Sequence, residues 1–360
     1  MRTQNREVDE MRRLFVFSVC CLVMSSFLVC GFGNKLVYGA EKPYELKFYS
    51  PYFEQHLMVK YAYKPWMSKV AEMSGGKVKI VFYPPNSIVK MPEVFDATKS
   101  GLIDIGGSLC GELRGKFPMT ELMEMPLLFT SATAGSLTLW KLYNKYPEFQ
   151  KEYQDTKVMW LWLSAIQQVL TSKKQVKTLD DMKGLKIAAQ SKALLDTIKA
   201  LGALPVQVSP PEVYMAMDRG VVDGCLMPFV GAKGIKVFEA AKYAAKADIM
   251  SISFFCVMSE QKYKELPPDV KKILDDTLFE GMVRASGEAL DRGDAECKAE
   301  VQKTDGVTVY ELPAQERERW IKAIMPVREI MLKDAEAKGY KNAREIVNEA
   351  MKLSEQYKKK

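Results

Sequence analysis

Short strand-like runs and amphipathic helical segments alternate along the first half of the chain. Apolar residues at 44–50 and 78–83 predict two strands, separated by a helical segment at 54–73 that Pro65 should interrupt. Such a β-α-β unit places its two strands in parallel. The other elements predicted in this half are a helix at 92–100 and strands at 103–107 and 158–163. We therefore expect a parallel or mixed sheet covered by helices.

The second half repeats this order and one local pattern. Its predicted elements are strands at 185–189 and 205–208 and a helix at 192–201. In both halves a glycine, Gly101 or Gly220, occupies the position where a helix ends. An aspartate follows three positions later, Asp104 in the first half and Asp223 in the second. The recurrence predicts two α/β lobes of related construction with a cleft between them.

The last third of the chain is mainly helical. Apolar residues at helical spacing predict a long helix from Pro268 to about Lys303, which either bends at a glycine or lies across both lobes. The glycines available for a bend are Gly281, Gly287 and Gly293. The remaining predicted elements are a strand at 307–310 and helices at 313–332, kinked at Pro326, and at 341–356.

An uncharged apolar stretch at 14–33 follows Arg12 and Arg13 and precedes small residues near Ala40. This pattern is typical of a secretory signal, with an uncleaved membrane anchor as the alternative. We therefore expect residues 1–40 to be a signal peptide and the mature protein to be periplasmic.

Composition narrows the class of protein further. Hydrophobic residues make up 48% of the 360 residues, which excludes wholesale disorder. The 52 Lys and Arg residues are interspersed with 45 Asp and Glu residues, so no nucleic-acid-binding surface is indicated. We expect buried thiols rather than disulfides or metal ligands from the cysteines beyond the signal, which contain no C-x-x-C motif. These cysteines are Cys110, Cys225, Cys256 and Cys297.

Residues for catalysis are scarce. The single histidine, His56, falls at the start of a predicted helix, and we interpret it as a helix-surface or capping residue. No H-E-x-x-H, Walker A or G-x-G-x-x-G motif is present. The sequence therefore predicts a protein that binds a ligand, with no catalytic residue, metal site or cofactor.

Several segments resemble the solute-binding subunit of tripartite ATP-independent periplasmic (TRAP) transporters, the DctP family. The strongest are 178–187 (TLDDMKGLKI), 212–217 (EVYMAM) and 220–224 (GVVDG). Weaker matches, in the order typical of the family, are 75–78 (GGKV), 125–129 (MPLLF) and 263–268 (YKELPP). Together they span nearly the whole chain beyond the signal.

The resemblance implies an α/β, type II periplasmic-binding-protein fold, in which two lobes close around a solute and a long C-terminal helix connects them. We expect lobe 1 to comprise 41–165 and 251–285, and lobe 2 to comprise 166–250 and 286–360 with the C-terminal helices. The closed protein would deliver a small organic solute to the small and large membrane subunits of an importer driven by an ion gradient. The alternative is a periplasmic ligand-sensing subunit for a signalling receptor.

The chain departs from the family where the substrate is recognised. Most members carry an arginine, which holds the substrate carboxylate with two hydrogen bonds, at the position occupied here by Ala188. A second basic position is Gln168, and the usual Gly-x-Glu-Asn-Pro is replaced by GCLMP at 224–228. A carboxylate clamp is therefore not expected here.

Three ligand classes remain open. A neutral or aromatic solute would pack on Met227 and Phe229 and bond to Gln168, Gln190 and Ser191. An organic acid would need Lys90 as a substitute cation, and a cation would pack on Tyr52 and Trp160, although Trp160 or Trp162 should lie in the core. The predicted ligand-binding residues are Gln168, Ala188, Gln190, Ser191, Met227, Phe229, Tyr214, Lys90, Ser108, Tyr52 and Trp160.

Overall fold

The first sheet is mixed and takes four of its five strands from the first half of the chain. The computed structural model describes residues 43–303 and 306–358, and in this part five strands follow the order β2-β1-β3-β10-β4. Strand β1 pairs in parallel with β2 and β3, whereas β10 pairs antiparallel with β3 and β4. The strands are β1 (Tyr44–Tyr49), β2 (Val78–Tyr83), β3 (Ile105–Leu109), β4 (Thr156–Leu163) and β10 (Ser253–Ser259). The predicted mixed sheet is confirmed.

A second mixed sheet has six strands in the described residues, in the order β11-β9-β5-β8-β6-β7. Strand β6 pairs in parallel with β7 and β8, and β5 pairs antiparallel with β8 and β9. The strands are β5 (Gln168–Thr171), β6 (Lys186–Ala189), β7 (Leu204–Gln207), β8 (Gly224–Met227), β9 (Tyr243–Lys246) and β11 (Thr308–Glu311). In the first sheet, β1 thus lies between two parallel neighbours, β2 and β3. In the second sheet, β6 lies in the same way between β7 and β8.

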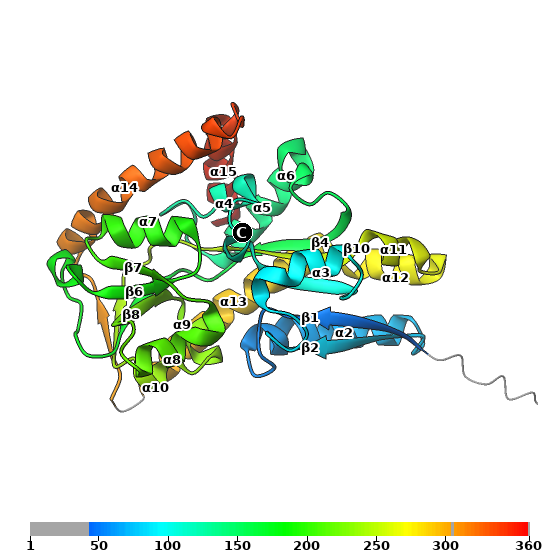
Figure 1. Ribbon diagram of the computed structural model, residues 1–360, viewed down its shortest axis with the longest axis horizontal. Helices are drawn as coiled ribbons and strands as arrows, with labels where there is room; N and C mark the ends of the chain where they lie inside the picture. Colours follow the sequence, from blue (N-terminus) through cyan, green and yellow to red (C-terminus); the bar gives the residue numbers. More distant parts are fainter. Residues whose placement is uncertain (1–42, 304–305, 359–360) are drawn as a thin grey trace, which may run out of the picture. The chain divides into compact units, whose positions relative to one another are not determined.

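Helices surround both sheets (Figure 1). Beside the first half lie the π-helical turn η1 (Val59–Tyr63), α2 (Lys64–Met73), α3 (Val94–Lys99), α4 (Pro118–Leu122), α5 (Ala132–Lys145) and α6 (Pro147–Lys151). The next helices are α7 (Lys192–Ala200), α8 (Val213–Asp218), α9 (Phe229–Gly234), α10 (Val237–Ala240), α11 (Glu260–Glu265) and α12 (Pro268–Thr277). The chain continues with α13 (Glu280–Val301), α14 (Ala314–Ala337) and α15 (Ala343–Lys358).

The repeated glycine–aspartate pattern has the same structural role in both halves. Gly101 and Gly220 adopt positive φ angles of 80° and 70°, which end α3 and α8. The Asp104 carboxylate accepts a 2.8 Å hydrogen bond from the backbone N–H of Lys47 in β1. Asp223 accepts an equivalent 2.8 Å bond from Lys186 in β6. The predicted relation between the two halves is therefore confirmed at these turns.

The long predicted helix is two helices. It breaks between α12 and α13, where Phe279 has a φ of 59° and its backbone N–H donates to the Met159 carbonyl at 3.3 Å. None of the three predicted glycines marks a bend, because each lies inside α13. Helix α13 instead packs against α5 and β4 beside the first sheet and against α9 beside the second (Figure 1). The prediction that this segment lies across both halves is confirmed.

The two C-terminal helices lie beside different parts of the protein. Helix α14 continues through Pro326 and packs against α7, whereas α15 packs against α5. The predicted lobe boundaries stay a prediction, and α15 lies next to a helix of the first half.

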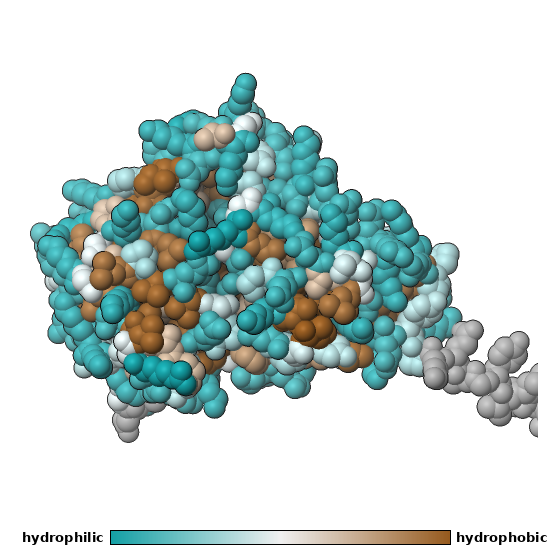
Figure 2. Space-filling view, viewed as in Figure 1, coloured by the Kyte–Doolittle hydropathy of each residue, from teal (hydrophilic) through white to brown (hydrophobic). Residues whose placement is uncertain are grey.

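Figure 2 shows apolar side chains gathered over the region of α8 and β7, where Leu204, Met215 and Val221 are exposed.

Buried sulfur and indole groups fill the interior. The four cysteines of the described chain are free and buried, as predicted. Trp160 and Trp162 are both fully buried in β4.

The predicted signal segment, 1–40, lies outside the described residues. Within residues 43–303 and 306–358, no helix is long and apolar enough to cross a membrane.

Candidate solute-binding site

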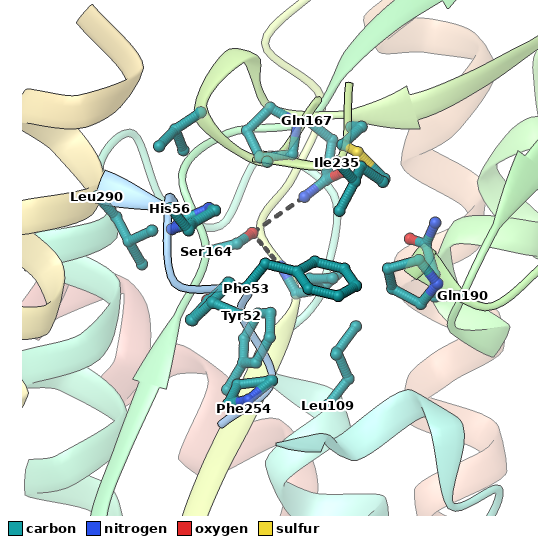
Figure 3. Close-up of a pocket in the computed structure, with 17 residues that line it drawn as sticks. Tyr52, Phe53, His56, Leu109, Ser164, Gln167, Gln190, Ile235, Phe254 and Leu290 are labelled. Carbon is teal, nitrogen blue, oxygen red and sulfur yellow. Dashed lines mark hydrogen bonds between the residues drawn. The ribbon is translucent and has the colours of Figure 1, made fainter. Parts of the chain in front are cut away.

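A cavity of about 60 Å³ lies between the two sheets (Figure 3). Residues at the carboxyl ends of four parallel strands reach it: Tyr52 after β1, Leu109 in β3, Gln190 after β6 and Met227 in β8. Leu290 of α13 contributes from the connecting helix. Carboxyl ends of parallel strands are the usual place for a ligand in open α/β sheets. This cavity is therefore the candidate site.

One wall of the cavity is a stack of aromatic rings. The Tyr52 ring lies 4.2 Å from the His56 ring and 5.5 Å from the Phe254 ring, measured between centroids. Phe254 in turn stacks on Trp162 at 5.1 Å, and the Trp162 indole N–H donates to the Tyr52 hydroxyl at 3.2 Å. These contacts fix the orientation of the rings. The wall offers a flat apolar surface to a solute.

His56 is an internal residue of this wall. Its side chain is only 3% exposed, so the prediction of a helix-surface position is wrong. The alternative, a capping role, is confirmed because Nδ1 accepts a 3.0 Å hydrogen bond from the backbone N–H of Met58. Burial lowers the pKa of His56 to about 3, which keeps the ring neutral near pH 7. Because Nδ1 is an acceptor, the proton of the neutral ring is on Nε2.

Two glutamines add polar atoms to the cavity. Gln167 donates from Nε2 to the Ser164 hydroxyl at 3.0 Å, and its Oε1 is buried with no partner in the described chain. The Nε2 atoms of Gln190 and His56 are also buried and unpartnered among the described residues. Each such atom costs on the order of 1–3 kcal/mol. The site therefore contains three polar groups that a solute could satisfy.

Ionised side chains are absent from the cavity lining in the part of the chain that the structure describes. Lys90, the predicted substitute cation, is exposed at the start of a 3₁₀ turn, Met91–Glu93, and does not line the cavity. Neutral His56 supplies no charge. A solute bound here would meet aromatic rings and neutral hydrogen-bonding groups.

Three of the eleven predicted ligand-binding residues, Tyr52, Gln190 and Met227, line the cavity. Ser191 lies next to it and caps α7, its hydroxyl accepting from the Leu194 N–H at 3.3 Å. Ala188 is fully buried in β6, opposite Cys225 of β8. The small Ala188 side chain places no polar group in the cavity.

The other predicted residues lie elsewhere in the described chain. Gln168 holds the segment after β9, because its Oε1 accepts from the N–H groups of Ala247 and Asp248 at 2.9 and 3.0 Å. Phe229 lines a separate depression together with Gln168. Ser108 donates to the Met91 carbonyl at 3.1 Å. Of the remaining two, Trp160 lies in the core and Tyr214 lies on α8.

Residues beyond the predicted set complete the lining, among them Phe53, His56, Ser164 and Gln167. The Phe53 ring extends across the cavity toward Gln190 (Figure 3). These residues follow β1 or β4 in the sequence. The signal that could have found them is this position directly after a strand.

The two sheets approach each other closely at the edge of the cavity. Gly111, which follows β3, lies so near Ser191 that an added Cβ would stand 2.4 Å from the Ser191 Cβ and 2.8 Å from its Cα. The Ser209 hydroxyl donates to Glu112 Oε1 at 2.7 Å. Gln55 Nε2 donates to the Gly234 carbonyl at 3.1 Å. These contacts join residues of the first half to residues of the second.

Buried carboxyl groups form a cluster near this edge. Glu124 is fully buried and accepts hydrogen bonds from the backbone N–H and hydroxyl of Ser253 at 2.8 and 2.6 Å. Burial is the main cause that raises the pKa of Glu121 and that of Glu152 to about 8. The Glu124 carboxyl group raises the pKa of Glu121 further. Glu121 and Glu152 therefore hold protons in the folded protein near pH 7.

These carboxyl groups predict a stability that depends on pH. Unfolding returns the pKa of Glu121 to its ordinary value near 4.5, so the unfolded chain binds fewer protons between about pH 5 and pH 8. Stability should fall as pH rises through this range. Below about pH 6.5 the low pKa of His56 opposes this trend. There the unfolded chain binds a proton at His56 that the folded protein does not, so this group makes stability rise with pH. The carboxyl effect is therefore clearest from pH 6.5 to 8.5.

Glu121→Gln should remove part of this dependence. The amide keeps the shape of the protonated acid but cannot ionise, so its gain in stability over the unmodified protein should be larger at pH 8.5 than at pH 6.5, by about 1–3 kcal/mol. Urea unfolding at both pH values measures this gain. The exposed Glu318→Gln is the control and should give the same stability as the unmodified protein. An equal effect of Glu121→Gln at both pH values would contradict the assignment.

Comparison with known proteins now decides the family. The model of the bacterial extracellular solute-binding protein family 7, DctP, matches residues 52–334. The chain belongs to this family. The DctP-family protein is 25% identical to the C4-dicarboxylate-binding protein DctB of Bacillus subtilis, over 72% of this chain and 74% of that protein. It is 26% identical to the C4-dicarboxylate-binding periplasmic protein DctP of Rhodobacter capsulatus, over 72% and 78% respectively.

Solved structures of TRAP solute-binding proteins are similar to the whole described fold. One from Rhodoferax ferrireducens T118, in complex with copurified benzoate, has a TM-score of 0.83 and 27% identity, over 88% of this chain and 98% of that one. A marine metagenome protein with 3-hydroxybenzoate has a TM-score of 0.82 and 25% identity, over 88% and 99%. A mandelate-bound protein from Bordetella bronchiseptica, at 22% identity and a TM-score of 0.80 over 88% and 100%, supports the fold.

The predicted class of protein is confirmed by these similarities. The DctP-family protein is an extracytoplasmic solute-binding protein of the TRAP type, and it is a transport protein rather than an enzyme. Its predicted partners, a small organic solute and the TRAP membrane subunits, belong to this class. The matched proteins give no support to the alternative of a sensor subunit for a signalling receptor.

Proposed function

We propose that this DctP-family protein captures a small aromatic solute in the cavity between its two sheets and releases it to TRAP membrane subunits. The observation that carries the proposal is the stack of His56, Tyr52 and Phe254 in a lining without ionised residues, with Trp162 stacked behind Phe254. An aromatic solute would add one ring to this stack. Benzoate and 3-hydroxybenzoate in two similar proteins support a solute of this size.

Two further parts of the proposal concern export and movement. Residues 1–40 direct export as a cleaved signal, and the two sheets with their helices act as lobes that close on the solute. Closure needs a solute that binds the closed form more tightly than the open form. Tyr52, Gln190 and Met227 provide contacts from both sheets, so a solute touching all three would favour closure. We propose these residues as binding residues.

The proposal is tested by identifying what the protein binds. Native mass spectrometry of residues 41–360, followed by denaturation, should release a compound with an aromatic ring. In a thermal-shift screen, aromatic compounds should raise the melting temperature by several degrees, and C4-dicarboxylates such as succinate should not. Succinate binding without any aromatic binding would overturn the proposal.

A pair of methionine variants connects binding to this cavity. Met227→Phe adds volume to the lining, so it should remove at least half of the melting-temperature shift caused by the aromatic compound. The control is Met215→Phe on α8, where the side chain is 40% exposed and outside the cavity. The control should keep the full shift. An equal shift in both variants would place the aromatic solute elsewhere.

A further inference from the structure

The unpartnered polar atoms of the cavity define which solute groups fit. Two of them are donors, and one is an acceptor. His56 donates from Nε2, because Nδ1 accepts from the Met58 N–H and the ring carries a single proton. Gln190 donates from its Nε2, which is buried without a partner in the described chain. A solute needs acceptor groups at both positions.

The acceptor is Gln167 Oε1, and its orientation follows from the neighbouring hydroxyl group. The Ser164 hydroxyl uses its one proton to donate to the Ala165 carbonyl at 2.7 Å. It must therefore accept from the Gln167 side chain, which places Gln167 Nε2 toward Ser164 at 3.0 Å. Gln167 Oε1 is thereby left as an acceptor without a donor among the described residues. A solute needs a donor group here.

A carboxylate matches this arrangement poorly. It has acceptors only, so it cannot bond to Gln167 Oε1, and no cation of the described chain lines the cavity. Burying an anion without a cation carries a large desolvation cost. The carboxyl group of Glu112, bonded to Ser209 beside the lining residue Pro210, adds an acidic group at the edge. The charge pattern of the described residues thus disfavours an anion.

We infer that the solute is an uncharged aromatic compound with both hydrogen-bond acceptors and a donor, such as an aryl carboxamide, rather than an aromatic carboxylate. This inference rests on the proposed function, capture of an aromatic solute in this cavity. The acceptors bind His56 Nε2 and Gln190 Nε2, and the donor binds Gln167 Oε1. His56, Gln167 and Gln190 lie around the Phe53 ring in Figure 3, so the groups occupy different parts of the solute.

Two compounds that differ in one group test the inference. 3-Hydroxybenzamide and 3-hydroxybenzoate share a ring and a hydroxyl group, but the first carries an uncharged amide with N–H donors and the second carries an anionic carboxylate that only accepts. In titration calorimetry at pH 7.5, the amide should bind at least about 10-fold more tightly than the carboxylate. Tighter binding of the carboxylate would overturn the inference while leaving the proposed aromatic solute intact. Failure of both, and of every aromatic compound in the screen, would overturn the proposed function as well.

Substitution of His56 tests its donor separately from its cap. In His56→Asn the side-chain oxygen can still accept from the Met58 N–H, but the Nε2 donor is lost. Affinity for 3-hydroxybenzamide should fall about 10-fold. Thermal unfolding without solute shows whether the variant keeps its fold. Unchanged affinity in a folded His56→Asn protein would overturn the assignment of His56 as a donor to the solute.

Gln190 offers a second test that does not depend on the helix cap. Gln190→Leu removes the donor at similar volume, and it should lower the affinity for 3-hydroxybenzamide about 10-fold. The matched control is Gln207→Leu in β7, where the glutamine is exposed. The control should bind 3-hydroxybenzamide as the unmodified protein does. Equal affinity of both glutamine variants would overturn the inferred contact.

Discussion

Gly111→Ala should lower the affinity for an aromatic solute on the order of 100-fold while leaving the protein folded. The added Cβ would stand 2.4 Å from the Ser191 Cβ and 2.8 Å from the Ser191 Cα. Gly111 follows a strand of the first sheet and Ser191 follows a strand of the second, so the clash separates the two sheets beside the cavity. Overpacking of this kind costs about 1–3 kcal/mol. The cost applies to the closed form only, which reduces binding.

Calorimetry with 3-hydroxybenzamide measures the change in affinity, and small-angle X-ray scattering measures whether the solute still compacts the protein. Ser191→Gly in the same chain removes the contact with the Ser191 Cβ, so the double variant should recover part of the affinity. Recovery would remain incomplete because the Ser191 Cα and the Gln190 carbonyl, 3.1 Å away, remain. Full affinity in Gly111→Ala alone would show that solute binding does not need this approach of the sheets.

Gly287→Ala should destabilise the fold by about 3 kcal/mol. Gly287 lies where α13 crosses the start of α5, and an added Cβ would stand 2.5 Å from the Thr133 Cα and 2.9 Å from its backbone nitrogen. The neighbouring Asp291 carboxylate accepts from the N–H groups of Ala132 and Thr133 at 2.7 and 2.9 Å. Moving the helices apart would strain the packing and weaken these bonds.

The matched control is Gly281→Ala in the same helix. Nothing lies within 4 Å of a Cβ built at Gly281, so this change should stabilise the helix by roughly 0.5–1 kcal/mol. Urea unfolding monitored by circular dichroism compares the two variants at one pH. Equal stability of Gly287→Ala and Gly281→Ala would refute the close packing of α13 on α5.

The predicted long helix breaks between α12 and α13 for a reason that the local sequence pattern does not contain. The apolar spacing runs on from Val270 to Met282, so the sequence predicts one helix. In the structure, the Phe279 ring lies 6.1 Å from the Trp140 ring, and its backbone bonds to Met159. A tertiary contact therefore overrides the helical preference of this segment. Two of the three glycines, Gly287 and Gly293, instead allow close packing of α13 against its neighbours.

The order of the elements was predictable because it depends on neighbours in the sequence. Glycine at the end of a helix and aspartate three positions later recur at 101–104 and 220–223, and both turns form as expected. The family resemblance rested on similar local segments, and it covers residues 52–334. The absence of arginine at Ala188 was likewise visible in the sequence alone. Local chemistry of this kind needs no distant partner.

The sequence by itself determined the alternation of strands and helices, the two related halves, the family and the loss of the usual arginine. Only the tertiary structure decided that His56 is buried and neutral, and that Gln167, rather than Gln168, lines the cavity. Gly234 packs against the His56 ring although the two lie far apart in the sequence. A side chain's burial, pKa and unpartnered atoms depend on such distant neighbours, and these come together only when the two sheets meet.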